Sequence, residues 1–467
     1  MSLCLEQPFS PSLTIRPRSI AGIDSITPPD EKRRPMTTLA ITGGHVLLPD
    51  ITVTRADVLV DQDGGEILEI GDDLAGEADE TLDASASLVT PGFVNGHCHV
   101  AMTLLRGYAD DKPLDAWLQE DIWPVEAELT AETVRAGTEL GTLEMIKSGT
   151  TSFADMYFFV PTIADVVDEA GLRARLGHGV ISVGKDEAAV HEDAQEGLEV
   201  AAEIDGMADG RITSAFMPHS LTTVDGQYLS EYVPKARELG VPVHYHANET
   251  KDEVTPIVEN HGVRPLAYAA EKGMLESEDF IAHGVHVDES EIGLLAEAET
   301  SVIHCPASNM KLASGMAPVQ RLLEAGVTVG LGTDGAASNN DLSMLDEARD
   351  AAMLGKLAAD DASAVPAEAV VTMATQGSAD AIGLDTGRIE AGKPADLAVI
   401  DLEQPHLTPR HDLVSHLAYA AAASDVRHTV CDGQVLMRDR EVLTLDEAAV
   451  RARASEAAET LVARAED

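Results

Sequence analysis

The chain has 467 residues, of which 44% are hydrophobic, so it carries enough apolar material for a large folded core. Its 81 acidic and 32 basic residues leave a formal net charge of −49, which argues against a nucleic-acid-binding protein. An evenly acidic surface is typical of adaptation to high salt, where screening weakens the repulsion between like charges. The chain contains no apolar run of about 18 residues, and this predicts that no segment spans a membrane.

The first 90 residues divide into two parts. Residues 1–36 are rich in Pro and Ser and show no hydrophobic periodicity, so we expect a disordered or mis-assigned N-terminal extension there. They lack the long apolar stretch of a signal peptide, and the folded protein is expected to begin near Met36. Residues 37–90 alternate short apolar runs with Gly, Asp and Asn, a pattern that predicts short β-strands.

Between residues 91 and 385, short apolar runs alternate with longer amphipathic segments rich in Ala and Glu, which is typical of repeated βα units. Most runs end on a polar residue. They lie at 91–99, 150–156, 172–181, 212–220, 242–249, 279–286, 300–306 and 327–335. This pattern predicts an α/β fold, a (β/α)8 TIM barrel with its site at the strand C-termini. A doubly wound sheet is the alternative, but the first run lacks the Gly-rich phosphate turn of that fold.

The short β pattern returns over residues 386–446. We expect this segment and residues 37–90 to pair into one small β-sandwich formed from both chain ends. Residues 447–467 are rich in Ala, Glu and Arg, and they are predicted to form a C-terminal surface helix.

The first barrel run ends in "VNGHCHV", in which two histidines flank a cysteine. Side chains alternate between the two faces of a strand, so His97 and His99 point the same way and Cys98 points to the other face. Two imidazoles on one face at a barrel strand end are able to bind one metal ion. An HxH pair by itself is a weak signal, because buried histidines without a ligand role are common.

Two other runs add candidate ligands to this pair. His246 in "HYHANE" and Asp334 in "GTDG" would complete a site of three nitrogens and one oxygen with an open position, which suits catalytic zinc. Bound zinc lowers the pKa of its water to about 7. Glu249, three residues after His246, is placed to carry protons beside the metal. We therefore expect one Zn²⁺ per subunit, with another divalent transition metal as the alternative.

Six longer motifs occur in a fixed order between residues 91 and 402, and the resemblance that they support extends over nearly all of residues 37–460. They read "PGFVNGHCHVAMTLLRGYADD", "MPHSLTTV", "HANETKDE", "HCPASNMKLASGMAPVQ", "GTDGAASNNDLSMLDE" and "GRIEAGKPADLAVIDL". This set closely resembles the amidohydrolase superfamily and, within it, the methylthioadenosine/S-adenosylhomocysteine deaminase (5′-deoxyadenosine deaminase) family. Binuclear members of the superfamily carry a carboxylated lysine on strand 4, and "SAFMPHS" has no lysine here, which favours a single metal.

The resemblance implies roles for particular residues. His97, His99, His246 and Asp334 match the metal ligands, Glu249 the proton shuttle, and His283 the residue that holds the attacking water; Asp334 also takes part in catalysis. Glu126 and His219 match positions that bind ribose hydroxyls, and an exposed helix acid is the alternative for Glu126. A carboxylate and an imidazole are able to accept from and donate to a 2′,3′-diol.

Further polar residues have less certain roles. His178 stands where relatives that use S-adenosylhomocysteine often carry arginine, with Lys185 slightly beyond, and this shifts the expected preference toward neutral 5′-substituted adenosines. His178 and Glu249 are still counted among the substrate-binding candidates. His304 is expected either to contact substrate or to hydrogen-bond near the metal. Roles in packing or orientation are expected for His244 and Trp117, and Lys311 is a candidate for positioning a loop.

The expected function is metal-dependent hydrolytic deamination of 5′-substituted adenosines: 5′-methylthioadenosine, 5′-deoxyadenosine, S-adenosylhomocysteine or adenosine. The products would be the inosine analogue and ammonia. The alternative is a deaminase or chlorohydrolase acting on guanine, cytosine or a halogenated triazine. A non-catalytic binding relative is disfavoured because all four ligands are present. Expected partners are a small-molecule nucleoside and further copies of the chain, with no nucleic acid and no membrane. The four scattered cysteines predict a reduced, cytoplasmic protein.

Overall fold

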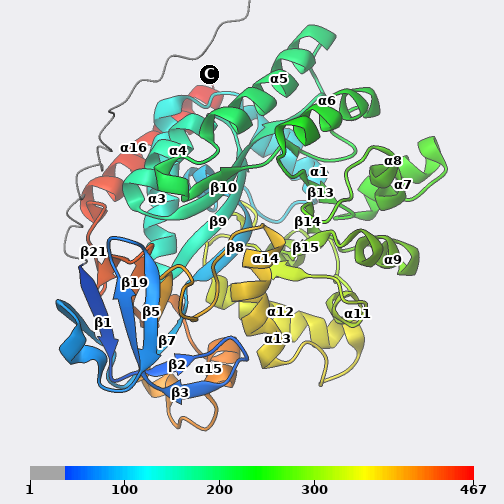
Figure 1. Ribbon diagram of the computed structural model, residues 1–467. Coiled ribbons are helices and arrows are strands. Elements are labelled where there is room, and N and C mark those ends of the chain that lie inside the picture. The colour runs from blue at the N-terminus through cyan, green and yellow to red at the C-terminus, as the bar shows by residue number, and fades with distance from the viewer. Residues whose placement is uncertain (1–36, 467) are drawn as a thin grey trace, which may run out of the picture. The chain divides into compact units, whose positions relative to one another are not determined.

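A computed structural model describes residues 37–466, and its centre is a ring of parallel strands (Figure 1). Each of the predicted barrel runs contains one of these strands, and two of the strands are split in two. They are β8 (Phe93–His99), β9 (Thr150–Tyr157), β10 (Arg173–Val180), β11 (Ile212–Ser214), β12 (Met217–Pro218), β13 (His244–Ala247), β14 (Phe280–His283), β15 (Ser301–His304), β16 (Val329–Leu331) and β17 (Asp334–Gly335). The extension predicted for residues 1–36 lies outside the described residues.

Strand pairing closes the ring. One parallel sheet has the order β11-β10-β9-β8-β17, and the other has the order β13-β14-β15-β16. Bridges between Phe216 and Val243 and between Ser220 and His246 join the two sheets on one side. On the other side, β16 and β17 are consecutive parts of one strand, and Asp334 of β17 pairs with Cys98 of β8. The predicted α/β barrel is therefore confirmed.

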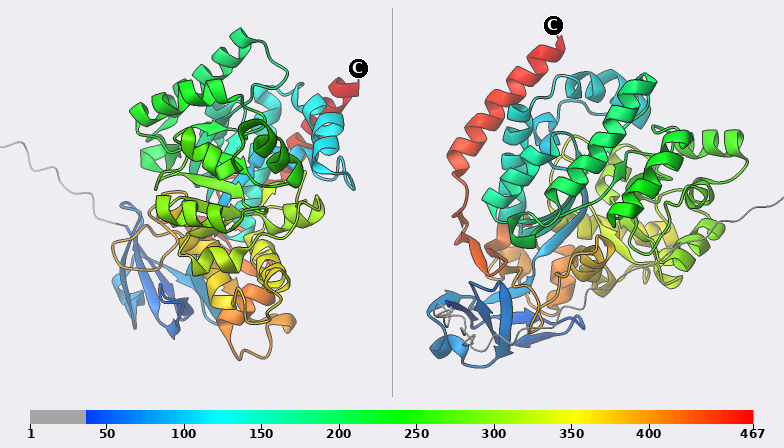
Figure 2. Two further views of the ribbon diagram at one scale, coloured as in Figure 1. Left: turned by 90° about the vertical axis from the view of Figure 1, so that its right-hand side faces the viewer. Right: turned by 45° about the horizontal axis from the view of Figure 1, so that its top comes forward.

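Helices connect the barrel strands and cover the outside of the ring, as the two views in Figure 2 show. They are α3 (Ala131–Ser148), α4 (Val160–Ala170), α5 (Glu187–Ile204), α6 (Gly226–Leu239), α7 (Lys251–His261), α8 (Pro265–Glu271), α9 (Glu289–Ala298), α10 (Pro306–Lys311), α11 (Val319–Glu324), α12 (Met344–Ala359), α13 (Ala367–Thr372) and α14 (Ser378–Ala381). The short helices α1 (Leu114–Trp117) and α2 (Trp123–Glu126) follow β8. No helix among residues 37–466 combines the length and apolar character needed to cross a membrane.

Local capping explains where several helices begin and end. The Asp288 side chain accepts hydrogen bonds from the backbone at the start of α9, and Glu291 completes a capping box with it. Helix α3 begins after Thr130, whose side chain accepts from the Thr133 backbone N–H, and ends at Gly149 with φ +84°. Such caps satisfy backbone groups that have no partner inside the helix.

Two further sheets, built from both ends of the chain, pack against each other. The first has the order β5-β4-β1-β6, and the second has the order β21-β20-β19-β18-β7-β2-β3. Their bounds are β1 (Thr38–Thr42), β2 (His45–Leu47), β3 (Val53–Arg55), β4 (Asp57–Asp61), β5 (Glu66–Gly71), β6 (Glu80–Asp83), β7 (Ser87–Pro91), β18 (Leu397–Asp401), β19 (Val426–Cys431), β20 (Gln434–Arg438) and β21 (Glu441–Val442). One apolar cluster includes Leu39 and Val58 from the first sheet with Val89 and Leu397 from the second. The domain boundaries given above stay predictions.

The C-terminal part of the chain returns to the barrel. Helix α15 (Leu413–Tyr419) follows β18, and helix α16 (Glu447–Glu466) ends the described chain. The Arg453 guanidinium of α16 donates to Glu139 Oε2 of α3 at 2.9 and 2.6 Å. Leu461 of α16 is fully buried. Helix α16 is therefore attached to the barrel by both an ion pair and apolar packing.

A buried ion pair connects the N-terminal end of β10 with the segment that precedes β18. Arg173 Nε donates to Asp396 Oδ2 at 2.8 Å, and Asp396 is only 1% exposed. The same carboxylate accepts from Thr386 Oγ1 at 2.6 Å and from the Asp432 backbone N–H at 2.7 Å. Every oxygen of Asp396 thus has a donor, and loss of the carboxylate would leave several buried donors without a partner.

We expect Asp396→Ala to lower the free energy of unfolding by about 3–5 kcal/mol, because it breaks a buried ion pair, leaves Asp432 as the remaining partner of the Arg173 guanidinium, and removes the acceptor of the Thr386 hydroxyl and the Asp432 backbone N–H. Arg427→Ala is the matched control, since its partner Asp439 is 60% exposed, and it should cost no more than about 1 kcal/mol. Urea unfolding at high salt measures both values. Equal losses in the two variants would contradict a structural role for the buried pair.

Candidate metal and substrate site

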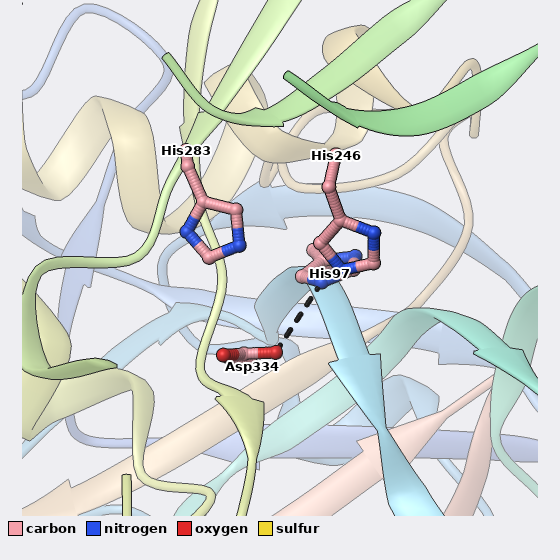
Figure 3. Close-up of side chains that lie close together, drawn as sticks. All are labelled: His97, His246, His283 and Asp334. Carbon is pink, nitrogen blue, oxygen red and sulfur yellow. Dashed lines mark ion pairs between the residues drawn. The ribbon is translucent and has the colours of Figure 1, made fainter. Parts of the chain in front are cut away.

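A group of histidines and an aspartate converges at the C-terminal ends of the barrel strands. His97 lies in β8, His246 in β13, His283 at the end of β14 and Asp334 in β17. One donor atom from each of these four buried residues lies within 4.8 Å of the donor atoms of the other three. Figure 3 shows that the three imidazoles and the carboxylate point toward a common space. This arrangement follows from the fold, because the C-terminal ends of parallel strands meet at one face.

His99 adjoins the same group. Its Nε2 atom lies 3.1 Å from Asp334 Oδ1, and its ring centroid lies 4.8 Å from that of His97. All four predicted ligands therefore meet, together with His283. The four donors that all lie within 4.8 Å of one another include His283 in the place that the sequence analysis gave to His99. A water-holding role for His283 and a ligand role for His99 both stay predictions.

Hydrogen bonds on the far side of two imidazoles determine which nitrogen faces the group. His99 Nδ1 donates to the Met156 carbonyl oxygen at 2.6 Å, and His246 Nδ1 donates to the His219 carbonyl oxygen at 2.7 Å. A carbonyl oxygen only accepts, so Nδ1 carries a hydrogen, and in the neutral ring Nε2 keeps the lone pair. Both rings therefore present Nε2 in the form that binds a metal ion.

Asp334 is held in a similar way. Its Oδ2 atom accepts from Ser308 Oγ and from Ser338 Oγ, both at 2.7 Å. Its Oδ1 atom faces the histidines, 3.1 Å from His99 Nε2 and 3.5 Å from His97 Nε2. The two serines thus satisfy one carboxylate oxygen and leave the other for the group.

Burial and the Asp334 charge act in opposite directions on these histidines. Burial lowers the pKa of His97 to about 4. Burial also opposes the charged form of His99, but the hydrogen bond and charge of Asp334 outweigh it and raise the pKa of His99 to about 9. A divalent cation in the same place would supply the positive charge that Asp334 attracts, so the donor set fits a metal ion.

Glu249 adjoins the group on the loop after β13. Its Oε2 atom lies 3.6 Å from His283 Nε2, and its Oε1 atom accepts from Ser314 Oγ at 3.1 Å. His283 Nδ1 is bonded to Asn309 Oδ1 at 3.0 Å, which leaves His283 Nε2 facing Glu249. Burial raises the pKa of Glu249, which favours the protonated form of its carboxyl group relative to an exposed glutamate.

A cavity of about 510 Å³ opens over this group. Its lining includes His99, His246, His283, Glu249 and Asp334, together with aromatic residues such as Trp117, Trp123 and Tyr157. None of the described residues that line it is a lysine or an arginine, whereas Asp115, Asp225, Asp252 and Glu253 are among them. The cavity is therefore suited to a ring-containing ligand that carries no strong negative charge.

Glu126 and His219, the two predicted ribose contacts, both line the cavity. Burial raises the pKa of Glu126 to about 7, against the opposing effect of the nearby Tyr157 hydroxyl. His219 Nδ1 is bonded to Thr223 Oγ1 at 2.9 Å. Burial lowers the pKa of His219 to about 3, so its ring is neutral. These two residues offer hydrogen-bonding groups inside an otherwise largely aromatic cavity.

His178 and His304 are not among the residues that line the cavity, and their substrate contacts stay predictions. His178 Nε2 faces Asp193 Oδ1 at 3.1 Å, and Lys185 Nζ lies 2.8 Å from the same oxygen. His304 is 1% exposed, and neither ring nitrogen has a hydrogen-bond partner among the described residues. The alternation of side chains along β10 and β15 directs these two rings away from the cavity.

Other residues of the site were missed or left open by the sequence analysis. Tyr157 is the last residue of β9, and the predicted run stopped one residue earlier. Ser314 lies within a quoted motif but carried no recognisable pattern of its own. Trp117 lines the cavity and donates from Nε1 to the Ala109 carbonyl oxygen at 3.1 Å. Lys311 Nζ lies 2.9 Å from the Ala337 carbonyl oxygen and 2.6 Å from Asp110 Oδ1, so it joins two loops near the site.

Comparisons with known proteins agree with this geometry. The chain is 67% identical over 432 residues to 5-methylthioadenosine/S-adenosylhomocysteine deaminase of Haloarcula marismortui, covering 92% of this chain and 100% of the relative. It is 44% identical to 5′-deoxyadenosine deaminase of Methanosarcina mazei, covering 92% of this chain and 99% of that protein. The crystal structure of an adenosine deaminase from Xanthomonas campestris with bound zinc aligns with a TM-score of 0.86 and 37% identity, covering 91% of this chain and 99% of that chain.

The family comparison covers most of the barrel and part of the sandwich. The model of the amidohydrolase family matches residues 88–436, a range that contains every residue of the site described above. With the relatives at 44–67% identity over nine-tenths of the chain, this match confirms the predicted resemblance. The chain belongs to the amidohydrolase family.

Proposed function

We propose that this protein catalyses the metal-dependent hydrolytic deamination of 5′-substituted adenosines to the corresponding inosine analogues and ammonia. The observation that carries the proposal is the convergence of three imidazoles, the Asp334 carboxylate and Glu249 beneath a cavity that also presents Glu126 and His219. The curated relatives named above support the same reaction class. Purine deamination needs an activated water at the amino-bearing carbon and a proton donor at the adjacent ring nitrogen. This cavity offers groups for both.

We propose one zinc ion per subunit, held by His97, His99, His246 and Asp334, with another divalent transition metal as the alternative. Three imidazole nitrogens and one carboxylate oxygen with an open position suit catalytic zinc. When bound, zinc acts as a Lewis acid and lowers the pKa of its water to about 7. The zinc-containing adenosine deaminase structure supports this choice of metal.

The residues around that position divide the proton transfers between them. His283 Nε2 orients the attacking water, and Asp334 Oδ1 accepts one of its protons. Glu249, whose pKa is raised by burial, protonates a ring nitrogen and makes the amino-bearing carbon electrophilic. Attack gives a tetrahedral carbon, and protons passed through Glu249 and Asp334 then reach the amino group, which leaves as ammonia. General acid–base catalysis of this kind contributes about 10²–10⁴-fold.

The charges around the cavity favour a neutral 5′ substituent such as methylthio or hydrogen over the homocysteine group. The cavity lining has no lysine or arginine among its described residues. Asp193 pairs with both His178 and Lys185, so neither side chain remains available for a substrate carboxylate. The competing reading, a deaminase or chlorohydrolase for a free base or triazine, gives Glu126 and His219 no diol to bind.

The remaining expectations concern the protein in its cell. We propose that it is a cytoplasmic homo-oligomer that takes a small-molecule nucleoside. The net charge of −49 and the similarity to the Haloarcula marismortui protein support a protein adapted to high salt. Activity measurements therefore belong in concentrated salt, where the repulsion between surface carboxylates is screened.

The zinc-loaded protein should release ammonia from 5′-methylthioadenosine and 5′-deoxyadenosine in high-salt buffer. For S-adenosylhomocysteine, kcat/KM should be lower than for these two substrates by a factor of about ten or more, because its carboxylate finds no cationic partner. Coupled ammonia release measures all three, and protein treated with a chelator is the control. Failure of every adenosine derivative to release ammonia would rule out the proposed reaction.

Glu249→Gln should keep its metal content and lose about 10²–10⁴-fold in kcat, since the amide cannot donate the required proton. Glu259→Gln, an exposed carboxylate on helix α7, which begins two residues after Glu249, is the matched control and should keep the kcat of the wild type. Metal analysis and steady-state rates give both quantities. A wild-type kcat in Glu249→Gln would show that another group moves the proton.

The double variant Glu126→Gln/His219→Gln should lower kcat/KM for 5′-methylthioadenosine by on the order of 10²-fold, because two hydrogen bonds to the diol are weakened. The rate with 9-methyladenine, which has the same reacting ring and no diol, should stay at its wild-type value. Equal losses on the two substrates would contradict a diol-binding role. An unchanged rate on both would favour the free-base reading.

A further inference from the structure

A chain of hydrogen bonds runs from the metal-binding group into the barrel wall through two histidines. His97 Nδ1 lies 2.8 Å from His244 Nε2, and His244 Nδ1 lies 2.8 Å from the Phe280 carbonyl oxygen. Both imidazoles are completely buried. His97 Nε2, on the side of the group, has no hydrogen-bond partner among the described residues. The series of hydrogen bonds therefore ends at His97 Nε2, an atom that has no hydrogen-bond partner among the described residues.

The Phe280 carbonyl oxygen sets the direction of this chain. A carbonyl oxygen only accepts, so His244 Nδ1 must carry a hydrogen. A neutral His244 then has a lone pair on Nε2, which accepts the hydrogen from His97 Nδ1. His244 forms no ion pair with a described carboxylate, and a buried unpaired imidazolium would be costly. The consequence is that His97 keeps its own lone pair on Nε2.

His97 differs in this respect from the other two predicted nitrogen ligands. His99 and His246 donate to the backbone carbonyls of Met156 and His219. Of the three predicted imidazole ligands, His97 is the one whose Nδ1 partner is a side chain. Its tautomer therefore depends on one residue that a substitution can change.

Neighbouring strands hold the His244 ring in the required orientation. His244 lies in β13 directly opposite Phe280 of β14 in the parallel register. Its ring stacks on the Phe280 ring at 4.1 Å between centroids and 15° between planes. The His244 backbone N–H donates to the Phe216 carbonyl oxygen at 3.0 Å. The ring is thus placed by backbone pairing and aromatic stacking, neither of which involves the metal-binding group.

We propose that His244 is a positioning residue for the metal site: it accepts the Nδ1 hydrogen of His97 and thereby presents His97 Nε2 as a lone-pair donor. The inference rests on the proposed metal-binding function. Its physical basis is that hydrogen bonds to the far side of a ligating imidazole determine its tautomer and orientation, and their loss typically weakens metal binding by about 10–100-fold.

Two substitutions separate the acceptor role from simple packing. His244→Phe keeps an aromatic ring for stacking but removes the acceptor, so zinc should bind about 10–100-fold more weakly. His244→Gln supplies an amide oxygen to accept from His97 and an amide nitrogen to donate to Phe280, so it should recover most of the affinity. Competition with a chromophoric chelator measures zinc binding by the full-length protein.

His191→Phe is the matched control, since the His191 Nδ1 bond to the Tyr232 hydroxyl at 2.8 Å lies outside the site. It should leave zinc affinity unchanged. Wild-type affinity in His244→Phe, or the same loss in His244→Phe and His244→Gln, would overturn the proposal. Absence of zinc binding in the wild type would instead overturn the proposed metal function.

The position of the hydrogen on the His97 ring can be measured directly in the wild-type protein, without an activity assay and without a variant. Nitrogen-15 NMR of the histidine-labelled, metal-free wild type should show His97 protonated at Nδ1 and His244 protonated at Nδ1. In His244→Phe, if it folds, the His97 signal should shift toward the Nε2-protonated form. A wild-type spectrum with the His97 hydrogen on Nε2 would overturn the proposal without any variant.

Discussion

The pairing of β17 with β8 is the contact on which the site depends. It closes the barrel, and in doing so it places Asp334 opposite Cys98, between His97 and His99. Residues more than 230 positions apart in sequence thereby come within 3.1–3.5 Å. Without the pairing of β17 with β8, the two histidines on β8 and the carboxylate on β17 would lie too far apart to bind one ion. The same strand pairing therefore both closes the barrel and assembles the site.

Each member of the group is also held from behind. Two serines satisfy Asp334 Oδ2, backbone carbonyls hold His99 and His246, and His244 holds His97. These contacts determine which atoms face inward. Positive φ angles at His283 (+74°) and Asp334 (+60°) are part of the same arrangement. Residues in this backbone region are costly and persist where surrounding contacts hold them in place.

Burial gives carboxylates in and around the cavity a character different from those on the surface. The net charge of −49 belongs mainly to exposed acids, whose charges salt screens. Burial raises the pKa of Glu126 to about 7 and also raises that of Glu249. Acidic residues on the surface therefore suit the protein to high salt, whereas those in the cavity exchange protons or form hydrogen bonds. Burial accounts for this difference, because it raises the pKa of the carboxyl groups in the cavity.

The sequence by itself determined the barrel, the paired β segments and the residues that converge at the strand ends, because strand alternation and the βα period are local properties. It could not show that β9 extends to Tyr157, that Ser314 reaches Glu249, or that His178 and His304 lie outside the cavity. These features depend on where loops and side chains meet across distant strands. His244 is the clearest case: its presence was visible in "HYHANE", but only the register of β13 against β14 placed it between His97 and the Phe280 carbonyl.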